Sequence, residues 1–292
     1  VLETDWCLTL QKWPIQTPAT FAQYPAAALM YRQGYIDEGP VVINEALALE
    51  DLYQFKGGAL SQPFAHDSAR AGELPPDVAL DVAALTGVDP LAFLVGRVRQ
   101  TISESPGAPL IATNLAACIN RAEKTVRSAT GQIALDYGRG LLTVNAPRAQ
   151  GATGFLRDAG CIELDNLHIT MSNEYGAVML VALDNMPLAS SRRMLLQVMS
   201  EEQTYNWQTE PVRASFGRNE PAVDARRITN IGTAPVIVRE LSGTLELKRP
   251  DARRLRVQAL DFNGYPHGAP GPATRFNLAP RTLYYLISAP GG

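Results

Sequence analysis

Aromatic side chains are the residues of this chain best suited to binding chemistry, because flat rings can stack on the faces of pyranose sugars. Trp207 and Tyr205 lie in a long polar stretch, and Tyr265 follows a turn. Trp6 and Trp13 lie near the N-terminus, where packing against another part of the protein would explain them equally well. We predict carbohydrate contacts at Trp207, Tyr205 and Trp6, with Trp207 as the best candidate.

Acidic residues occur in close pairs along the chain. Glycoside hydrolysis needs two carboxyl groups that face each other across about 5–9 Å, whereas adjacent residues of a strand point to opposite faces. We interpret the pairs as exposed acids and predict no catalytic residue. The pairs are Glu3 and Asp5, Asp37 and Glu38, Glu50 and Asp51, and Glu201 and Glu202.

The sequence lacks the short motifs of common enzyme sites. It contains no Gly-x-Ser-x-Gly elbow, no His-Glu-x-x-His motif, no P-loop and no Gly-x-Gly-x-x-Gly fingerprint. The three cysteines, Cys7, Cys118 and Cys161, have neither Cys-x-x-Cys nor Cys/His metal spacing. We interpret them as small buried thiols, and the pairing of any two of them stays open.

The histidines do not indicate a metal site either. We interpret His66 and His267 as loop or turn residues, and His168 as a surface residue of its strand. Residues 261–264 resemble part of a calcium loop but lack the remaining ligands, which favours a plain turn. The sequence therefore predicts no metal and no cofactor.

Composition excludes several classes of partner. The 292 residues carry a net charge of −3 and no basic stripe with interleaved aromatics, so we expect no nucleic-acid partner. No apolar run approaches the roughly 18–20 residues of a membrane-spanning helix, so we expect no membrane partner. The chain opens at Val1 without an initiator Met or a signal peptide. We interpret it as a portion of a longer protein, whose export this end does not reveal.

Alternating apolar residues predict a β-rich fold. Two such runs flank the turn at 138–140, where glycines permit positive φ, and this is typical of a β-hairpin. A helix is expected from Pro25 to Gln33, ended by Gly34, and a shorter one within 110–121. Further strands are predicted at 41–43, 93–98, 166–171, 177–183, 193–198, 236–239, 244–248, 254–260 and 283–287.

About ten short strands with close turns favour an antiparallel β-sandwich. We predict three parts. Residues 1–38 form an aromatic-rich helical segment that needs a packing partner, residues 39–90 form an extended arm or linker, and residues 91–292 form the sandwich. A polar insertion is expected at 199–225.

Several segments together resemble the C-terminal region of large bacterial glycoside hydrolases with a (β/α)8 catalytic barrel. The resemblance covers nearly the whole chain and implies that residues 1–38 are the last barrel helix and its approach. It also implies catalytic carboxylates upstream, a secreted or periplasmic location, and Asn185 at a turn position that such proteins tend to fill with Gly. The segments are Trp13–Ile15, Tyr24–Arg32, Thr86–Gly96, Ala146–Gly151, Leu183–Leu188, Asn230–Pro235 and Leu260–Pro266.

This resemblance leads us to expect the non-catalytic C-terminal portion of a glycoside hydrolase acting on poly- or oligosaccharides. Its partner would be an upstream barrel domain, or an N-terminal fragment of the same protein that carries the barrel. Two alternatives stay open. One is a stand-alone carbohydrate-binding β-sandwich, and the other is a structural module that embraces a partner with the arm at 40–90.

Overall fold

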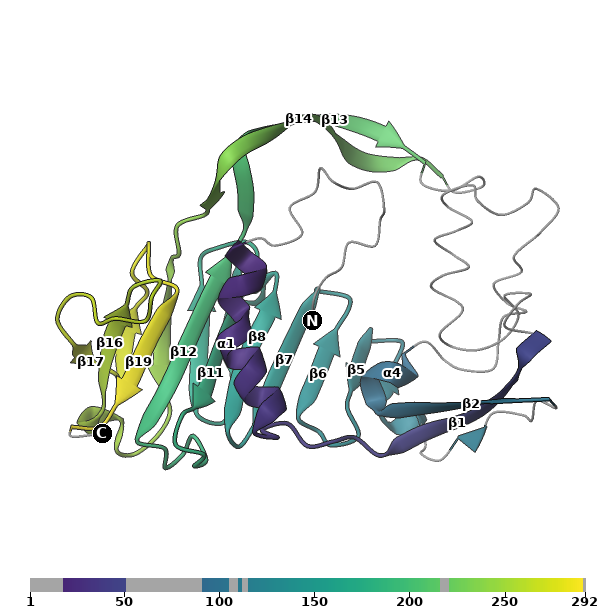
Figure 1. Cartoon of the computed structure of the whole chain (residues 1–292), viewed down its shortest axis with the longest axis horizontal. Coiled ribbons are helices and arrows are strands. Elements are labelled where there is room, and N and C mark those ends of the chain that lie inside the picture. Colours follow the sequence, from purple (N-terminus) through teal and green to yellow (C-terminus); the bar gives the residue numbers. More distant parts are fainter. Residues whose placement is uncertain (1–17, 51–90, 105–109, 112–114, 216–220, 291–292) are drawn as a thin grey trace. The chain divides into compact units, whose positions relative to one another are not determined.

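The computed structural model describes residues 18–50, 91–104, 110–111, 115–215 and 221–290 (Figure 1). Contacts divide the chain into two units, which are described separately. The first comprises the described parts of residues 1–37, 131–206 and 232–292. The second comprises those of residues 38–130 and 207–231. Both are built mainly from strands, as the sequence predicted.

The predicted hairpin is present in the first unit. Strand β6 (Ile133–Asp136) pairs antiparallel with β7 (Leu141–Ala146), so that Ile133 lies opposite Val144 and Leu135 opposite Leu142. Gly140 adopts φ +65° in the turn between them. This confirms the prediction that a glycine supplies the left-handed backbone at the bend.

A large antiparallel sheet continues from this hairpin. In the first unit its strand order is β17-β16-β19-β12-β11-β8-β7-β6 (Figure 1). Besides β6 and β7, the sheet contains β8 (Ala149–Gly154), β11 (Gly176–Ala182), β12 (Arg193–Ser200), β16 (Arg256–Leu260), β17 (Gly271–Pro272) and β19 (Tyr284–Ser288). The pairing register puts Leu180 and Leu196 side by side on one face, and both are fully buried.

A smaller antiparallel sheet covers that face. Its strand order is β18-β15-β10-β9, and its inward residues Ile169 and Leu245 share one core with Leu180 and Leu196. Two sheets that pack face to face through a common core are consistent with the predicted β-sandwich. The strands are β9 (Cys161–Glu163), β10 (Leu167–Met171), β15 (Gly243–Leu247) and β18 (Arg275–Asn277). Short helices α5 (Leu156–Ala159) and η2 (Ala252–Arg254) connect strands.

Helix α1 (Pro18–Arg32) packs on the other face of the large sheet, against β11 and β12 (Figure 1). The backbone N–H of Ala26 donates to Oε1 of Gln197 over 3.1 Å. The helix ends near Gly34 as predicted, but its predicted start at Pro25 is wrong. Pro25 lies inside the helix, where proline removes one backbone hydrogen bond. Packing of Ala26, Leu29 and Met30 against the sheet core compensates.

The second unit holds a small separate core made of Val42, Ile43, Ala92, Val95 and Val126. Strand β1 (Val41–Ala48), expected from 41–43, pairs parallel with β2 (Arg97–Ser103) and antiparallel with β3 (Leu110–Ile111). The unit also contains α4 (Ala92–Val95), η1 (Leu115–Ala117), β4 (Ile119–Asn120) and β5 (Thr125–Arg127).

Two local predictions for this unit are wrong. Residues 93–98 do not form one strand, because residues 92–95 make a helical turn that buries Ala92 and Val95 three positions apart. A short apolar run does not distinguish strand from helix by its pattern alone. The helix expected within 110–121 is reduced to the single turn η1 between two short strands.

The expected polar insertion at 199–225 is an extended ribbon. Strands β13 (Glu202–Ala214) and β14 (Val223–Val238) pair with each other over its length (Figure 1). Thr, Val, Ile and aromatic residues, which favour strands, are interspersed with polar and charged ones there. Along β13, half-buried and exposed positions largely alternate. The strand expected at 236–239 is the end of β14.

A buried guanidinium links the two sheets of the first unit. Arg249, just after β15, has a side chain only 2% exposed. Its Nη1 donates to the carbonyls of Leu188 (2.6 Å) and Ser191 (2.7 Å) in the loop between β11 and β12. Its Nε and Nη2 donate to the two carboxylate oxygens of Asp251 at 2.6 and 2.8 Å. One side chain thus ties the smaller sheet to a loop of the larger one.

Asp184 organises the same loop. Its carboxylate accepts hydrogen bonds from Ser191 Oγ (2.8 Å) and from the backbone N–H groups of Arg192 (2.7 Å) and Met186 (3.2 Å). Burial tends to raise the pKa of Asp184, but these hydrogen bonds outweigh it and hold the pKa below 3.8. Asn185 adopts φ 59°, which confirms that Asn tolerates the left-handed turn position.

Replacing the buried guanidinium should destabilise the first unit. Arg249→Met leaves two buried carbonyls without their donor, at about 1–3 kcal/mol each. We expect the free energy of unfolding, measured by urea denaturation, to fall by about 3 kcal/mol in total. The control Arg253→Met changes an exposed arginine four residues away and should be nearly neutral. Equal effects of the two substitutions would contradict the role given to Arg249.

Acid should weaken the fold through Asp184. A carboxyl whose pKa is lowered by folding stabilises the native state while ionised, and this contribution is lost as the pH falls through the folded pKa. We therefore expect the free energy of unfolding to decrease as the pH falls below about 5. Asp184→Asn should flatten this decrease, whereas Asp224→Asn, at a 93% exposed side chain, should preserve it. Urea denaturation across pH measures both, and an unchanged slope in Asp184→Asn would refute the assignment.

Candidate functional site

The residues predicted to bind carbohydrate lie mostly on the ribbon. Tyr205 is 53% exposed on β13, and Trp207, on the same strand, is half-buried. Asn206 between them has φ 63°, which interrupts the regular alternation of the strand. Tyr205 and Trp207 therefore differ in exposure and do not form an evenly exposed pair. Trp6 lies outside the described residues.

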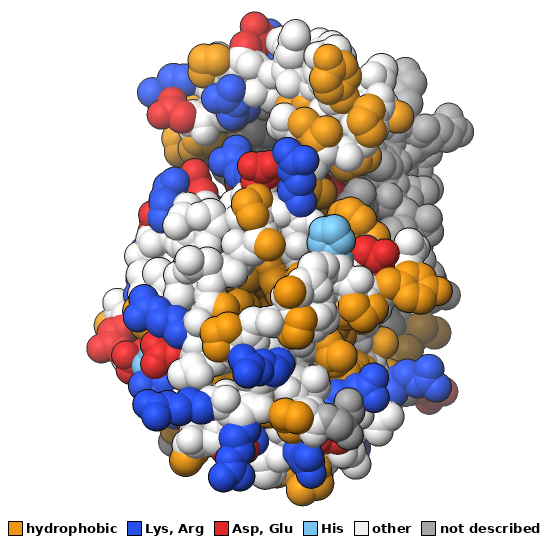
Figure 2. Space-filling model, turned by 90° about the vertical axis from the view of Figure 1, so that its left-hand side faces the viewer, with side chains coloured by type: hydrophobic (Ala, Val, Ile, Leu, Met, Phe, Trp, Pro, Cys, Tyr) orange, Lys and Arg blue, Asp and Glu red, His pale blue; other side chains and the backbone are white. Residues whose placement is uncertain are grey.

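A cavity lies at the edge of the large sheet, around the turn that follows β16. Its volume is about 140 Å³. This is less than the roughly 300–1,000 Å³ of typical small-molecule sites. Figure 2 shows this side of the molecule, where hydrophobic side chains lie among charged ones. The cavity is lined by Leu260, Asp261, Phe262, His267, Arg281, Thr282, Leu283 and Tyr284.

Asp261 shapes the turn beside this cavity. Its Oδ1 accepts hydrogen bonds from the backbone N–H groups of Asn263 and Tyr265, both at 2.9 Å. The backbone N–H of Gly264 also donates to the Asp261 carbonyl, which confirms the plain turn predicted at 261–264. Asp side chains stabilise such turns by bonding backbone two residues ahead. The turn leaves Phe262 74% and Tyr265 68% exposed.

Residues 267–268, which follow this turn, are held by a side chain of the sheet. Gln258 on β16 donates through Nε2 to the carbonyls of His267 (2.9 Å) and Gly268 (3.1 Å). Tyr284 on β19 lies directly opposite Leu260 in the sheet register. The neighbouring strands β16 and β19 thus bring the two halves of the cavity together, although they are distant in the sequence.

The polar groups of the cavity suit binding. Burial raises the pKa of Tyr284, so its phenol stays protonated and can donate a hydrogen bond at neutral pH. Arg281 presents a guanidinium whose Nε also contacts Glu240 Oε1 over 3.0 Å. Among the described lining residues Asp261 is the single carboxylate, and its Oδ1 already accepts two backbone hydrogen bonds. Aromatic rings beside a few hydrogen-bonding groups are typical of small-molecule sites in general.

A second cavity, of about 200 Å³, lies where the ribbon meets β12. It contains Glu201 and Glu202, one of the acidic pairs noted in the sequence. Glu201 Oε2 lies 3.0 Å from Arg239 Nε and forms an ion pair. Because the two glutamates are sequence neighbours and one of them is ion-paired, they do not form the opposed carboxylates of a glycosidase.

The sheet face under α1 is a further candidate surface. The pairing register places Leu135 and Leu142 in the same row as Met199, on the face that α1 contacts. Ile133, Leu135 and Leu142 are half-buried apolar residues of β6 and β7. The main contacts of α1 with this sheet are with β11 and β12. Strands β6 and β7 therefore lie towards the edge of the face that the helix covers.

Sequence reasoning pointed to the turn beside this cavity but not to the cavity itself, whose lining does not include Tyr265. It named Tyr265 as an aromatic that could stack on sugar, and it interpreted His267 as a turn residue. It missed the approach of Arg281 and Tyr284 to Phe262, because strand register is not visible in a single sequence. The available signal was the Asn263-Gly264 turn with an exposed aromatic residue on each side.

Compared with protein-family models, with curated proteins and with solved structures, the chain matches none of them. Among the described residues, no helix combines the length and the apolar character needed to cross a membrane.

Proposed function

We propose that the chain is the C-terminal, non-catalytic portion of a glycoside hydrolase acting on poly- or oligosaccharides, in which it braces an upstream (β/α)8 barrel. The resemblance of segments such as Ala146–Gly151 and Leu183–Leu188 to such enzymes supports this proposal. Ala146–Gly151 forms the turn from β7 into β8 and the first residues of β8. Leu183–Leu188 belongs to the loop between β11 and β12, in which the Leu188 carbonyl accepts a hydrogen bond from Arg249. They are therefore structural segments, as a bracing role requires.

The observation that carries the proposal is the apolar sheet face on which α1 packs. In this proposal α1 is the link between barrel and sandwich, and the half-buried residues of β6 and β7 are the surface against which the barrel packs. Apolar residues that the chain buries only in part are suited to a protein interface. The secreted or periplasmic location implied by the resemblance belongs to the same proposal.

Bracing predicts that a charge on this face weakens association with the barrel. We expect the chain to copurify with a separately produced barrel fragment encoded upstream, and Leu135→Asp to reduce the recovered complex at least tenfold. The reason is that Leu135 would be buried in the interface, where an unpaired carboxylate is costly. Pull-down followed by calorimetric titration measures the effect.

The matched control is Thr170→Asp, which places the same charge on an exposed position of β10 in the smaller sheet. It should leave the complex intact. Glycoside cleavage by the purified chain alone, or loss of association with Thr170→Asp but not Leu135→Asp, would refute the bracing function.

The cavity beside Phe262 favours a second candidate function, which is carbohydrate binding by the sandwich itself. We expect Phe262→Ala to weaken binding of soluble oligosaccharides at least tenfold, because an aromatic platform supplies on the order of 1 kcal/mol beyond its buried area. Calorimetric titration against a panel of oligosaccharides measures this, with Tyr31→Ala as a control at an aromatic residue of α1 that is 89% exposed.

Trp207→Ala separates this site from the one predicted on the ribbon. Loss of binding with Trp207→Ala and not with Phe262→Ala would assign the sugar contact to β13. Absence of binding to every oligosaccharide of the panel would reject this second function and leave the bracing role untouched.

A further inference from the structure

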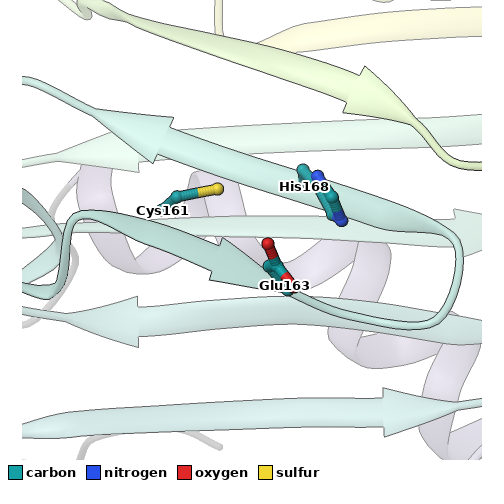
Figure 3. A group of neighbouring side chains, drawn as sticks. All are labelled: Cys161, Glu163 and His168. Atoms are coloured by element: carbon teal, nitrogen blue, oxygen red, sulfur yellow. The ribbon is translucent and has the colours of Figure 1, made fainter.

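Three side chains with metal-ligating atoms converge on the outer face of the smaller sheet. Figure 3 shows Cys161 and Glu163 on β9 and His168 on β10, with their functional groups close together. The sulfur, a carboxylate oxygen and an imidazole nitrogen all lie within 4.8 Å of one another. His168 pairs directly with Glu163 across the two strands, and Cys161 pairs with Thr170, two residues further along β10.

The β-alternation explains why all three side chains point outward. Ile162, Leu167 and Ile169 fill the intervening positions and are buried in the core. Cys161 and Glu163 are consequently two residues apart on the opposite, exposed face, which they share with His168. The interpretation of the cysteines as buried thiols is therefore wrong for Cys161, which is exposed, and for Cys118, which is half-buried. The core therefore fixes the direction in which the three groups lie.

The hairpin that carries them is held in place. Its turn is closed by a hydrogen bond from Leu164 N–H to the Leu167 carbonyl at 2.9 Å. The large sheet also holds the turn, because Asn145 Nδ2 donates to Asp165 Oδ1 at 3.0 Å and the Asn166 N–H donates to Gln150 Oε1 at 2.8 Å. A fixed backbone reduces the ordering cost of a bound ion.

The three groups are available for a ligand. None of their side chains makes a hydrogen bond or ion pair with another described residue, whereas half-buried Asp136 and exposed Asp158 are ion-paired with arginines. Glu246 on β15 lies opposite His168 on its other side. His168 is thus flanked by a glutamate on each neighbouring strand, and this excess of negative charge favours a cation.

We propose that Cys161, Glu163 and His168 bind a divalent transition-metal ion, with Zn²⁺ as the best-matched ion. Thiolate, imidazole and carboxylate are its usual donors, whereas Ca²⁺ and Mg²⁺ prefer oxygen alone. Tetrahedral zinc bonds of about 2.0–2.3 Å place ligand atoms about 3.3–3.8 Å apart, which rotation of these surface side chains can reach. Three protein donors leave the fourth position for water. This site does not depend on the proposed function.

Titration with Co²⁺, which mimics Zn²⁺ and is visible spectroscopically, tests the site. We expect the full chain, first treated with chelator, to bind one ion here, with a thiolate-to-cobalt absorption band that Zn²⁺ displaces. Cys161→Ser should remove the band, and His168→Gln and Glu163→Gln should each weaken the affinity at least tenfold.

Cys118→Ser and His267→Gln are the matched controls, since they change the other described cysteine and the other described histidine. Both should retain the band and the affinity. Circular dichroism checks that each variant keeps its fold, including Cys118→Ser at a partly buried position. Absence of the band in the unaltered chain, or its persistence in Cys161→Ser, would overturn the proposal.

Discussion

The fold of the first unit depends on the buried positive charge of Arg249, which needs hydrogen-bond partners. Arg249 is buried, and a buried guanidinium is tolerated only where hydrogen bonds replace its lost hydration. Here the partners come from different elements, since Leu188 and Ser191 belong to the β11–β12 loop and Asp251 follows β15. The Arg249 contacts therefore specify how the two sheets align, in addition to the non-directional hydrophobic burial between them. Asp184, at the start of the same loop, accepts hydrogen bonds from Ser191 and Arg192. These bonds hold the Ser191 carbonyl where it can accept from Arg249.

The sequence patterns predicted those helices and strands whose structure is determined mainly by their own residues. The hairpin at β6 and β7 and the strands β10, β11, β12, β15, β16 and β19 follow from alternation and turn residues. Strand β8 was missed because Ala149–Gly154 is rich in small residues with weak strand preference. Gly151 is small for a tertiary reason, since a Cβ there would lie 2.2 Å from the Val178 carbonyl oxygen of β11. This constraint becomes visible only when β8 and β11 lie side by side in the folded chain. The start of α1 before Pro25 is likewise explained only by its packing on the sheet.

The candidate sites were less predictable than the fold for a related reason. Phe262 and Tyr284 are separated by 21 intervening residues and meet because β16 pairs with β19. Cys161 and His168 lie on paired strands, and their seven-residue separation matches no common zinc spacing. Sequence reasoning judged each side chain by its own neighbours and correctly placed His168 on the surface of its strand. It could not supply the register that brings His168 beside Glu163. A site built from two strands can be predicted only if the pairing of the strands is known, in addition to the alternation within each strand.

The two faces of the first unit are suited to different partners. The α1 face carries half-buried apolar residues on β6 and β7, which favour contact with another folded surface. The outer face of the smaller sheet carries Cys161, Glu163, His168 and Glu246, which favour a small cation. Because the smaller sheet packs on the side of the large sheet opposite to α1, a barrel bound to α1 would leave the metal-ligating groups open to solvent. The proposed bracing role and the proposed metal site are therefore compatible in one molecule.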